Sequence, residues 1–521
     1  MRSKKKDNHP RARQKEIAVR RLRQLAKPRP SADPAQQRAA DLSPPPADSG
    51  AENTDYRVRV RMYRQGLGDC FLLTFPRKEG SPFNLLIDCG ALNRDKNFMR
   101  QVVEHIEKAV TVNGKSRLDL VVATHEHRDH LCGFNQARQI FSRMDIGGVW
   151  MGWTENLTEE EAKALKKAKK TAIQRLQAAL TSSFADHAGF NGVRSLLAFS
   201  EEDDTTGTGL IADALEYLKL RGKEAGIMKF LEPGDGPLDL AGVDDVRVYV
   251  LGPPRDPTLL KTSGVTEAMK GDVIYHLGVG GAEGFDALEN ALLSANVGAR
   301  NRAEDRCDPF GGEHRIPRKH KAFRNIKSYI QATYDVPDAN WRTIDEDWLD
   351  AFGQLALDLD SDTNNTSLVL AFEFVKSGQV LLFVGDAQVG NWQSWANVSF
   401  KIPGRDKELP AHDLVKRTVF YKVGHHCSHN ATMKCGGLEL MESEALVAFI
   451  PLDKETAKKQ GRKDAQGNPK GWDMPAKPLY QNLLRKAAGR VVISDVAEAV
   501  PAEALAAGIT FDKNYVDYIL K

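Results

Sequence analysis

The six residues His125-Glu126-His127-Arg128-Asp129-His130 decide how this chain can be interpreted. They follow the apolar run 118–124 (Leu-Asp-Leu-Val-Val-Ala-Thr), which is typical of a buried strand. The motif is therefore expected on a loop at the carboxyl end of that strand. The chain has 13 histidines in 521 residues, so three of them within six positions beside an aspartate exceed what chance would place together. The pattern indicates a metal site rather than an ordinary polar loop.

The spacing within the motif suggests which side chains share a metal ion. In an extended turn, His125 and His127 point the same way and could bind one ion, while Asp129 and His130 could bind a second. Imidazole nitrogens and carboxylate oxygens suit zinc, manganese or iron and disfavour a calcium site. We therefore predict one or two divalent ions, with zinc as the first choice and manganese or iron as alternatives.

Two later segments offer further ligands at the ends of apolar runs. The run 379–384 is typical of a buried strand and is followed by Gly385 and Asp386, whose carboxylate could bridge two metal ions. The run 419–423 indicates another strand, and it is followed by the sequence Gly-His-His-Cys-Ser-His at 424–429. Because each candidate ligand follows an apolar run, we expect the ligands to meet at one edge of the sheets.

The order of these motifs resembles the metallo-β-lactamase-fold hydrolases, and most closely the soluble hydrolase domain of the DNA-uptake protein ComEC and its free-standing relatives. The resemblance covers roughly residues 56–155, 228–254 and 362–500. The matched motifs are G-x-G-D at 66–69, L-I-D-x-G at 86–90, H-x-H-x-D-H at 125–130, N-x-x-S-L-V-L at 364–370, G-D at 385–386 and K-V-x-H-H-x-S at 422–428. All of them occur in the family's order.

The resemblance implies an α/β fold, an αββα sandwich in which two mixed sheets lie face to face with helices outside. In the implied centre, the first metal is bound by His125 and His127. The second is bound by Asp129, His130 and His425, with Asp386 as the bridge. The remaining roles are an orienting carboxylate for Asp88, outer positions for Asn365 and Ser367, and proton donation to the leaving group by His426 or His429. The catalytic candidates are Asp129, His426 and His429.

Two positions depart from the family's pattern. Many members carry a further histidine ligand before the Gly-Asp motif, whereas this chain has Asn364, Asn365 and Ser367 there, as the ComEC-like branch also does. The first metal could then bind weakly, or the protein could hold one metal only. The second departure is Cys427, which replaces the usual glycine; a thiol there could bind metal or be oxidised, but a small packed residue is the preferred interpretation.

Charge is concentrated at the amino terminus. The first 30 residues contain 12 lysines and arginines against two acidic residues, in a chain whose net charge is +3, so the remainder is net acidic. A basic arm of this kind suits nonspecific contact with the phosphates of DNA or RNA. The tentative contact residues are Lys4, Lys5, Lys6, Arg11, Arg13, Arg20, Arg21 and Arg23. A solubilising tail and a misassigned start codon are the alternatives.

The rest of the sequence sets the domain organisation. Residues 1–54 are expected to be the disordered basic arm and its Pro-rich linker, and residues 55–521 the hydrolase domain. Residues from about 255 to 345 match no motif and are expected to be a helical or irregular insertion. No apolar run approaches the roughly 20 residues of a membrane helix, and the scattered cysteines suggest reduced thiols. We therefore expect a cytoplasmic protein without a membrane partner.

Three functions remain open on the sequence alone. The first is a metal-dependent nuclease or phosphodiesterase that cleaves DNA or RNA with a metal-activated water. The second is a hydrolase of a small phosphodiester, ester or lactone, with the insertion as a lid. The third is a protein that binds nucleic acid or another partner on a degraded hydrolase scaffold.

Overall fold

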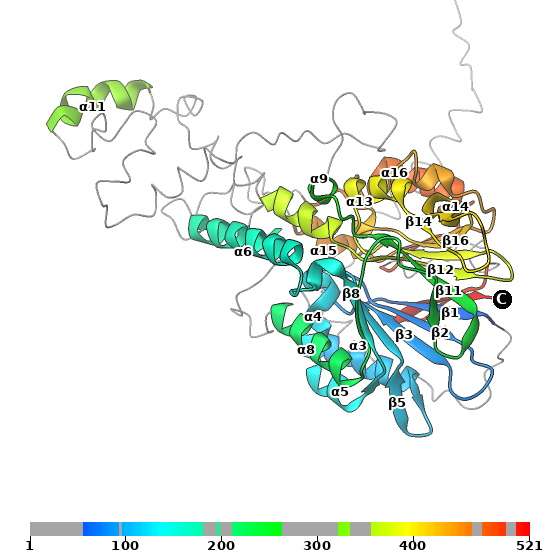
Figure 1. Cartoon of the computed structure of the whole chain (residues 1–521). Coiled ribbons are helices and arrows are strands. Elements are labelled where there is room, and N and C mark those ends of the chain that lie inside the picture. Colours follow the sequence, from blue (N-terminus) through cyan, green and yellow to red (C-terminus); the bar gives the residue numbers. More distant parts are fainter. Residues whose placement is uncertain are drawn as a thin grey trace, which may run out of the picture. The chain divides into compact units, whose positions relative to one another are not determined.

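A computed structural model describes the chain over several ranges (Figure 1): 56–92, 96–180, 194, 196–197, 211–262, 321–333, 356–460, 471–495 and 507–521. All of the described residues belong to one compact unit, Ala51–Lys521. The predicted arm and linker at 1–54 lie outside the described residues. Of the predicted insertion, the structure describes chiefly two helices, α9 (Pro257–Leu260) and α11 (Lys321–Thr333).

Two large mixed sheets dominate the described part of the chain, so the predicted α/β class is confirmed. The first sheet has eight strands: β19 (Ile509–Phe511), β20 (Tyr515–Leu520), β1 (Val58–Tyr63), β2 (Phe71–Phe75), β3 (Phe83–Ile87), β6 (Leu120–Ala123), β8 (Val149–Gly152) and β9 (Met228–Leu231). The second has seven: β10 (Leu238–Leu240), β11 (Val243–Gly252), β12 (Val369–Phe374), β13 (Val380–Phe383), β16 (Thr418–Lys422), β17 (Val447–Ile450) and β18 (Val491–Ile493). Small sheets are formed by β4 (Thr111–Val112), β5 (Lys115–Leu118) and β7 (Asp145–Ile146), and by β14 (Ser399–Phe400) with β15 (Leu409–Pro410).

One apolar core is shared by the two large sheets. It contains inward-facing residues of β1, β2, β3 and β6 together with residues of β11, β12, β13 and β16. Aromatic rings meet across it, with ring centroids 5.6 Å apart for Phe71 and Phe383 and 6.1 Å apart for Phe75 and Phe372. Burial of these faces is the main force that holds the sheets together.

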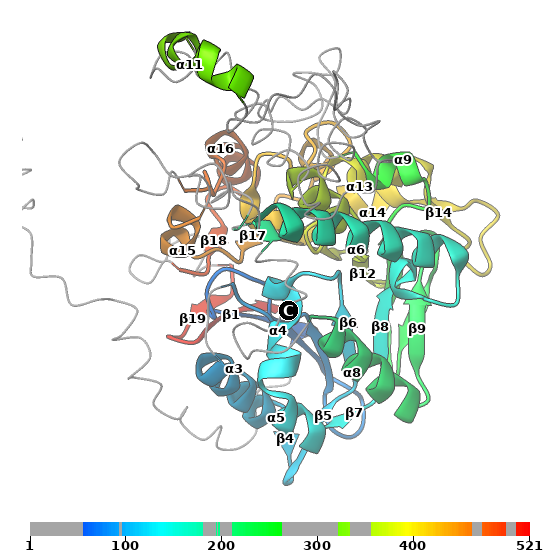
Figure 2. The same cartoon turned by 90° about the vertical axis from the view of Figure 1, so that its left-hand side faces the viewer.

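Helices cover the outer face of each large sheet (Figures 1 and 2). The first sheet is covered by α3 (Lys96–Ala109), α4 (Arg128–Gln136), α5 (Arg138–Arg143) and α8 (Ile211–Glu224). The second is covered by α13 (Val389–Ser394), α14 (Ala411–Lys416), α15 (Lys454–Lys458) and α16 (Lys477–Lys486). A further long helix, α6, spans Glu160–Leu180. No helix in the described ranges has the length and apolarity to cross a membrane.

The predicted ligands follow parallel strands of both sheets. In the first sheet β3 runs parallel to β6, and in the second β13 runs parallel to β16 and β16 to β17. Asp88 follows β3, Asp386 lies just after β13, and His425 just after β16. Because carboxyl ends of parallel strands lie at the same edge of a sheet, the ligands are brought together. The motif was expected on a loop, whereas its last residues, Asp129 and His130, lie in the first turn of α4.

Replacing Phe383 with alanine tests the shared core. Phe383 is 2% exposed and also contacts the rings of Phe372 and Phe420. We expect Phe383→Ala to lower the free energy of unfolding by about 3–5 kcal/mol because it leaves a cavity. The measurement is urea unfolding. Val375→Ala, at a residue that is 39% exposed, should change stability by no more than about 0.5 kcal/mol, and equal losses would contradict the proposed core.

Candidate metal centre

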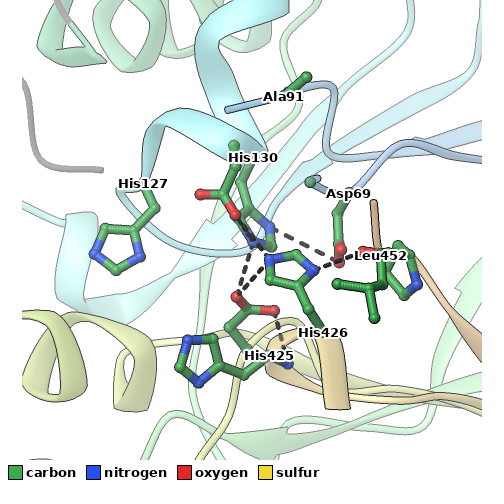
Figure 3. Close-up of polar contacts among 12 residues, drawn as sticks. Asp69, Ala91, His127, His130, His425, His426 and Leu452 are labelled. Carbon is green, nitrogen blue, oxygen red and sulfur yellow. Dashed lines mark hydrogen bonds and ion pairs between the residues drawn. The ribbon is translucent and has the colours of Figure 1, made fainter. Parts of the chain in front are cut away.

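Four buried side chains form a group that could hold a metal ion: Asp129, His130, Asp386 and His426. One ligand atom from each lies within 4.8 Å of the others. His426 Nε2 is 2.9 Å from Asp129 Oδ2, and His130 Nε2 is 3.2 Å from Asp386 Oδ2 (Figure 3). Two imidazole nitrogens and two carboxylates are a usual ligand set for a divalent transition metal. We call these four residues the central group.

Asp88 fixes the orientation of His130. Its carboxylate accepts hydrogen bonds from the backbone N–H of Thr124 (2.8 Å) and the hydroxyl of Thr124 (2.6 Å). The same carboxylate lies 2.7 Å from His130 Nδ1, so the other ring nitrogen of His130 faces Asp386. A carboxylate behind a histidine ligand sets its tautomer and its ring position. Asp88 thus lies behind His130, where it can orient that ring.

The two adjacent histidines after β16 have different surroundings. His426 Nε2 enters the central group, while its Nδ1 lies 2.7 Å from the carbonyl oxygen of Pro451. The ring of His425 instead contacts the Gln388 amide nitrogen (3.0 Å) and the Ser428 hydroxyl (2.8 Å). The central group therefore contains His426, which we had expected to donate protons, in the place expected for His425.

Backbone conformation separates these two rings. His425, His426 and Cys427 all have positive φ angles, of 38°, 50° and 65°. This left-handed region is unfavourable for residues other than glycine, and such strain is concentrated at functional sites. Cys427 is fully buried among apolar side chains, which agrees with its interpretation as a small packed residue. His429, the other predicted proton donor, is exposed.

His125 and His127 form a pair beside the central group. His125 Nε2 lies 3.1 Å from His127 Nδ1, and His127 stands to one side in Figure 3. Burial and the neighbouring His130 and His127 lower the pKa of His125 well below its usual value. Burial and the charge of Lys169 lower the pKa of His127 to about 3. Both imidazoles are therefore neutral at pH 7, which is the form that binds a metal.

Asn365 and Ser367 support the loop that carries Asp386. The Ser367 hydroxyl accepts a hydrogen bond from the backbone N–H of Asp386 (2.9 Å) and lies 3.2 Å from His125 Nδ1. The Asn365 side-chain oxygen accepts from the N–H groups of Gln388 and Asn391, each at 3.2 Å. Neither side chain belongs to the central group, and both support the loop from which Asp386 extends.

A buried lysine neutralises part of the acidic charge. Lys422 is 1% exposed and donates to Asp386 Oδ1 (3.1 Å) and to the Gly385 carbonyl oxygen (2.6 Å), and it also forms an ion pair with Asp69. Burial would raise the pKa of Asp386, but His130 and Lys422 lower it well below its usual value. Burial would lower the pKa of His130, but Asp386 and the other nearby carboxylates raise it well above its usual range.

Close backbone packing explains two glycines of the matched motifs. A Cβ atom on Gly90 would lie 2.3 Å from the carbonyl carbon of Asp129, and one on Gly68 would lie 2.4 Å from the Asp129 carbonyl oxygen. That oxygen accepts a hydrogen bond from the backbone N–H of Asp69 (2.9 Å). The G-x-G-D and L-I-D-x-G loops thus hold the backbone of the histidine motif from two sides.

The sequence reasoning assigned no role to three buried residues of the site. Lys422 and Asp69 lie within the matched motifs, and a lysine at the end of an apolar strand was a usable signal, because lysine is almost never fully buried unless it is paired. Asp360 lies outside the motifs, on a helix at 356–365, and its Oδ1 is 3.9 Å from His127 Nε2. Burial and the charges of Asp129 and Asp386 raise the pKa of Asp360 to about 8.

Comparisons with known proteins do not identify the chain. No protein-family model matches it, and a search of curated proteins finds no match. What the described residues establish is a buried His/Asp group that could hold a metal ion.

Removing the buried ammonium group tests the electrostatic arrangement of the site. We expect Lys422→Met to lower the free energy of unfolding by about 3–5 kcal/mol, because Asp69 and Asp386 would stay buried without their cation. Urea unfolding of the metal-free protein measures this. Lys416→Met is a matched control on the surface, where the pair with Asp413 should contribute about 0–1 kcal/mol.

The added substitution Asp69→Asn should restore part of the stability lost in Lys422→Met, because it removes one of the two carboxylates that lose their lysine. If Lys422→Met alone is as stable as the Lys416→Met control, Lys422 is not the cation that stabilises this edge.

Proposed function

We propose that this protein is a metal-dependent hydrolase of the metallo-β-lactamase fold that cleaves phosphodiester bonds in DNA or RNA. The observation that carries the proposal is the central group with the His125–His127 pair beside it. These side chains come from both large sheets and follow the order of the family's motifs. Zinc is the first choice of metal because imidazoles supply half of the central group, with manganese or iron as alternatives.

The layer arrangement supports the fold part of the proposal. An αββα sandwich requires two sheets with a common core and helices on both outer faces. The core shared by β1–β3 and β11–β13, and the separate helix-covered cores on the outer faces, fit this requirement.

The residues of the site have chemistry suited to hydrolysis. One or two bound ions would lower the pKa of a coordinated water and polarise a phosphoryl oxygen. The carboxylates of Asp129 and Asp386 and the ring of His426 would hold an ion in the central group, and Asp88 would keep His130 in position for it. Exposed His429 remains the proposed proton donor to the leaving group, since it can exchange protons with solvent.

A lysine-rich helix beside the site supports an anionic substrate. On α6, Lys166 and Lys169 form ion pairs with Glu126 of the histidine motif at 3.4 and 3.2 Å. Lys163, Lys167 and Lys170 of the same helix are exposed. Positive charge beside a candidate hydrolytic centre favours the approach of a phosphate backbone.

Carboxylate variants test the hydrolase proposal. Asp129→Ala and Asp386→Ala should each lower the cleavage of a chromogenic phosphodiester by more than about 100-fold, because each removes a direct metal ligand. The assay panel should also contain single-stranded DNA, duplex DNA and RNA, and metal content should be measured on the same samples. Asp413→Ala, on the surface of α14, is the control and should keep wild-type activity.

Full metal content in the double variant Asp129→Ala, Asp386→Ala would contradict the assignment of the ligands. Cleavage of the chromogenic compound without any cleavage of DNA or RNA would instead favour the small-molecule hydrolase.

Deletion of residues 1–30 tests the proposed basic arm. The deletion should weaken binding to long DNA or RNA while leaving turnover of the chromogenic phosphodiester unchanged, because the arm is expected to act by phosphate contact alone. Each lost phosphate contact should reduce the slope of log K against log salt by about 0.7–0.9. Fluorescence anisotropy at several salt concentrations measures both quantities. Equal affinity and slope with and without the arm would identify it as a solubilising tail.

A further inference from the structure

The helix at 356–365 lies against the candidate metal centre, although it contains none of the predicted metal ligands. Two of its side chains face the histidines. Asp360 is 7% exposed and Asn364 is fully buried. Asp360 Oδ1 lies 3.9 Å from His127 Nε2, and Asn364 Nδ2 lies 3.5 Å from His425 Nε2. The helix therefore forms one wall of the space beside His127 and His425.

The two nitrogens of His127 face different partners. Its Nδ1 lies 3.1 Å from His125 Nε2, a separation that suits two ligand atoms of one ion, whose bonds would each be about 2.0–2.1 Å long. Its Nε2 lies 3.9 Å from Asp360 Oδ1, which is longer than a direct hydrogen bond. A histidine ligand almost always gives its second nitrogen to a carboxylate, a carbonyl or water. Asp360 is the carboxylate that lies near this second nitrogen of His127.

In the side-chain amide of Asn364, the nitrogen has a hydrogen-bond partner among the described residues and the oxygen has none. Its Nδ2 donates a hydrogen bond to Asp360 Oδ2 at 3.1 Å. This contact places the amide nitrogen of Asn364, rather than its oxygen, next to Asp360. The other end, Asn364 Oδ1, is buried and has no hydrogen-bond partner within the described ranges. A buried acceptor of this kind costs free energy unless another group binds it.

We propose that Asp360 and Asn364 complete a first metal site with His125 and His127. Asp360 is a positioning residue that holds His127 by its Nε2, and Asn364 Oδ1 is an oxygen ligand that takes the place of the absent third imidazole. The inference rests on the proposed hydrolase function. An amide oxygen is a harder ligand than the imidazole that it replaces, so this site should favour manganese more strongly than a site of three imidazoles would.

Counting bound manganese tests the inference directly. The full-length protein is freed of metal with a chelator and titrated with Mn²⁺, and the number of sites is obtained by calorimetry and electron paramagnetic resonance. The wild type should bind two equivalents, with the spectrum of a coupled pair. Asn364→Ala should bind one equivalent, with the spectrum of an isolated ion, because the central group is intact. Asp360→Asn should weaken the first site by about 10- to 100-fold.

Asp362→Asn is the matched control on the same helix. Burial and the charge of Asp358 raise the pKa of Asp362 and Lys261 lowers it, with no contribution from the histidines, so this variant should keep both equivalents. Two equivalents of unchanged affinity in Asn364→Ala would overturn the inference, and so would loss of both. A wild type that binds a single equivalent would also overturn it, whereas a one-metal hydrolase at the central group would survive that result.

Discussion

The buried ammonium group of Lys422 is the interaction on which the site depends. It belongs to β16 of the second sheet, yet it pairs with Asp69 beside β2 of the first sheet as well as with Asp386. The apolar core can hold two sheets together in more than one relative position, because hydrophobic contact is not directional. An ion pair between buried groups requires a particular geometry. Lys422 therefore aligns the two sheet edges that carry the candidate ligands.

Local strain at the site is offset by contacts from both sheets. Asp88, His425 and His426 have positive φ angles, and each such residue costs of order 1–3 kcal/mol. Hydrogen bonds compensate at each position: Asp88 accepts from Thr124, His425 donates its backbone N–H to Asp386 (3.0 Å), and His426 contacts Pro451. The strained residues are those whose side chains are aimed at the centre or support it. This pattern is expected where a fold fixes the direction of side chains by holding the backbone in an unfavourable conformation.

The positions of the strands, and the gathering of the ligands at their ends, could be predicted from the sequence because apolar runs define buried strands directly. The choice between His425 and His426 could not, since two adjacent histidines look equivalent until the left-handed backbone turns their rings apart. Asp360 could not be found either. It reaches His127 from a helix more than 200 positions later in the chain, and no local pattern marks such a contact. Lys422 was visible in its strand, but only its burial reveals its partners.

Proton binding and metal binding must compete at this centre. Nearby carboxylates outweigh the effect of burial and raise the pKa values of His130 and His426, so protons on these rings balance part of the acidic charge. A metal ligand must be an unprotonated imidazole, so an ion entering the central group displaces those protons. Metal affinity should then fall as the pH falls. The His125–His127 pair differs in this respect, because burial lowers the pKa of both rings and leaves them neutral before any ion binds. The two halves of the candidate centre would thus accept a metal in opposite ways, one with neutral ligands and the other by exchange of protons for a cation.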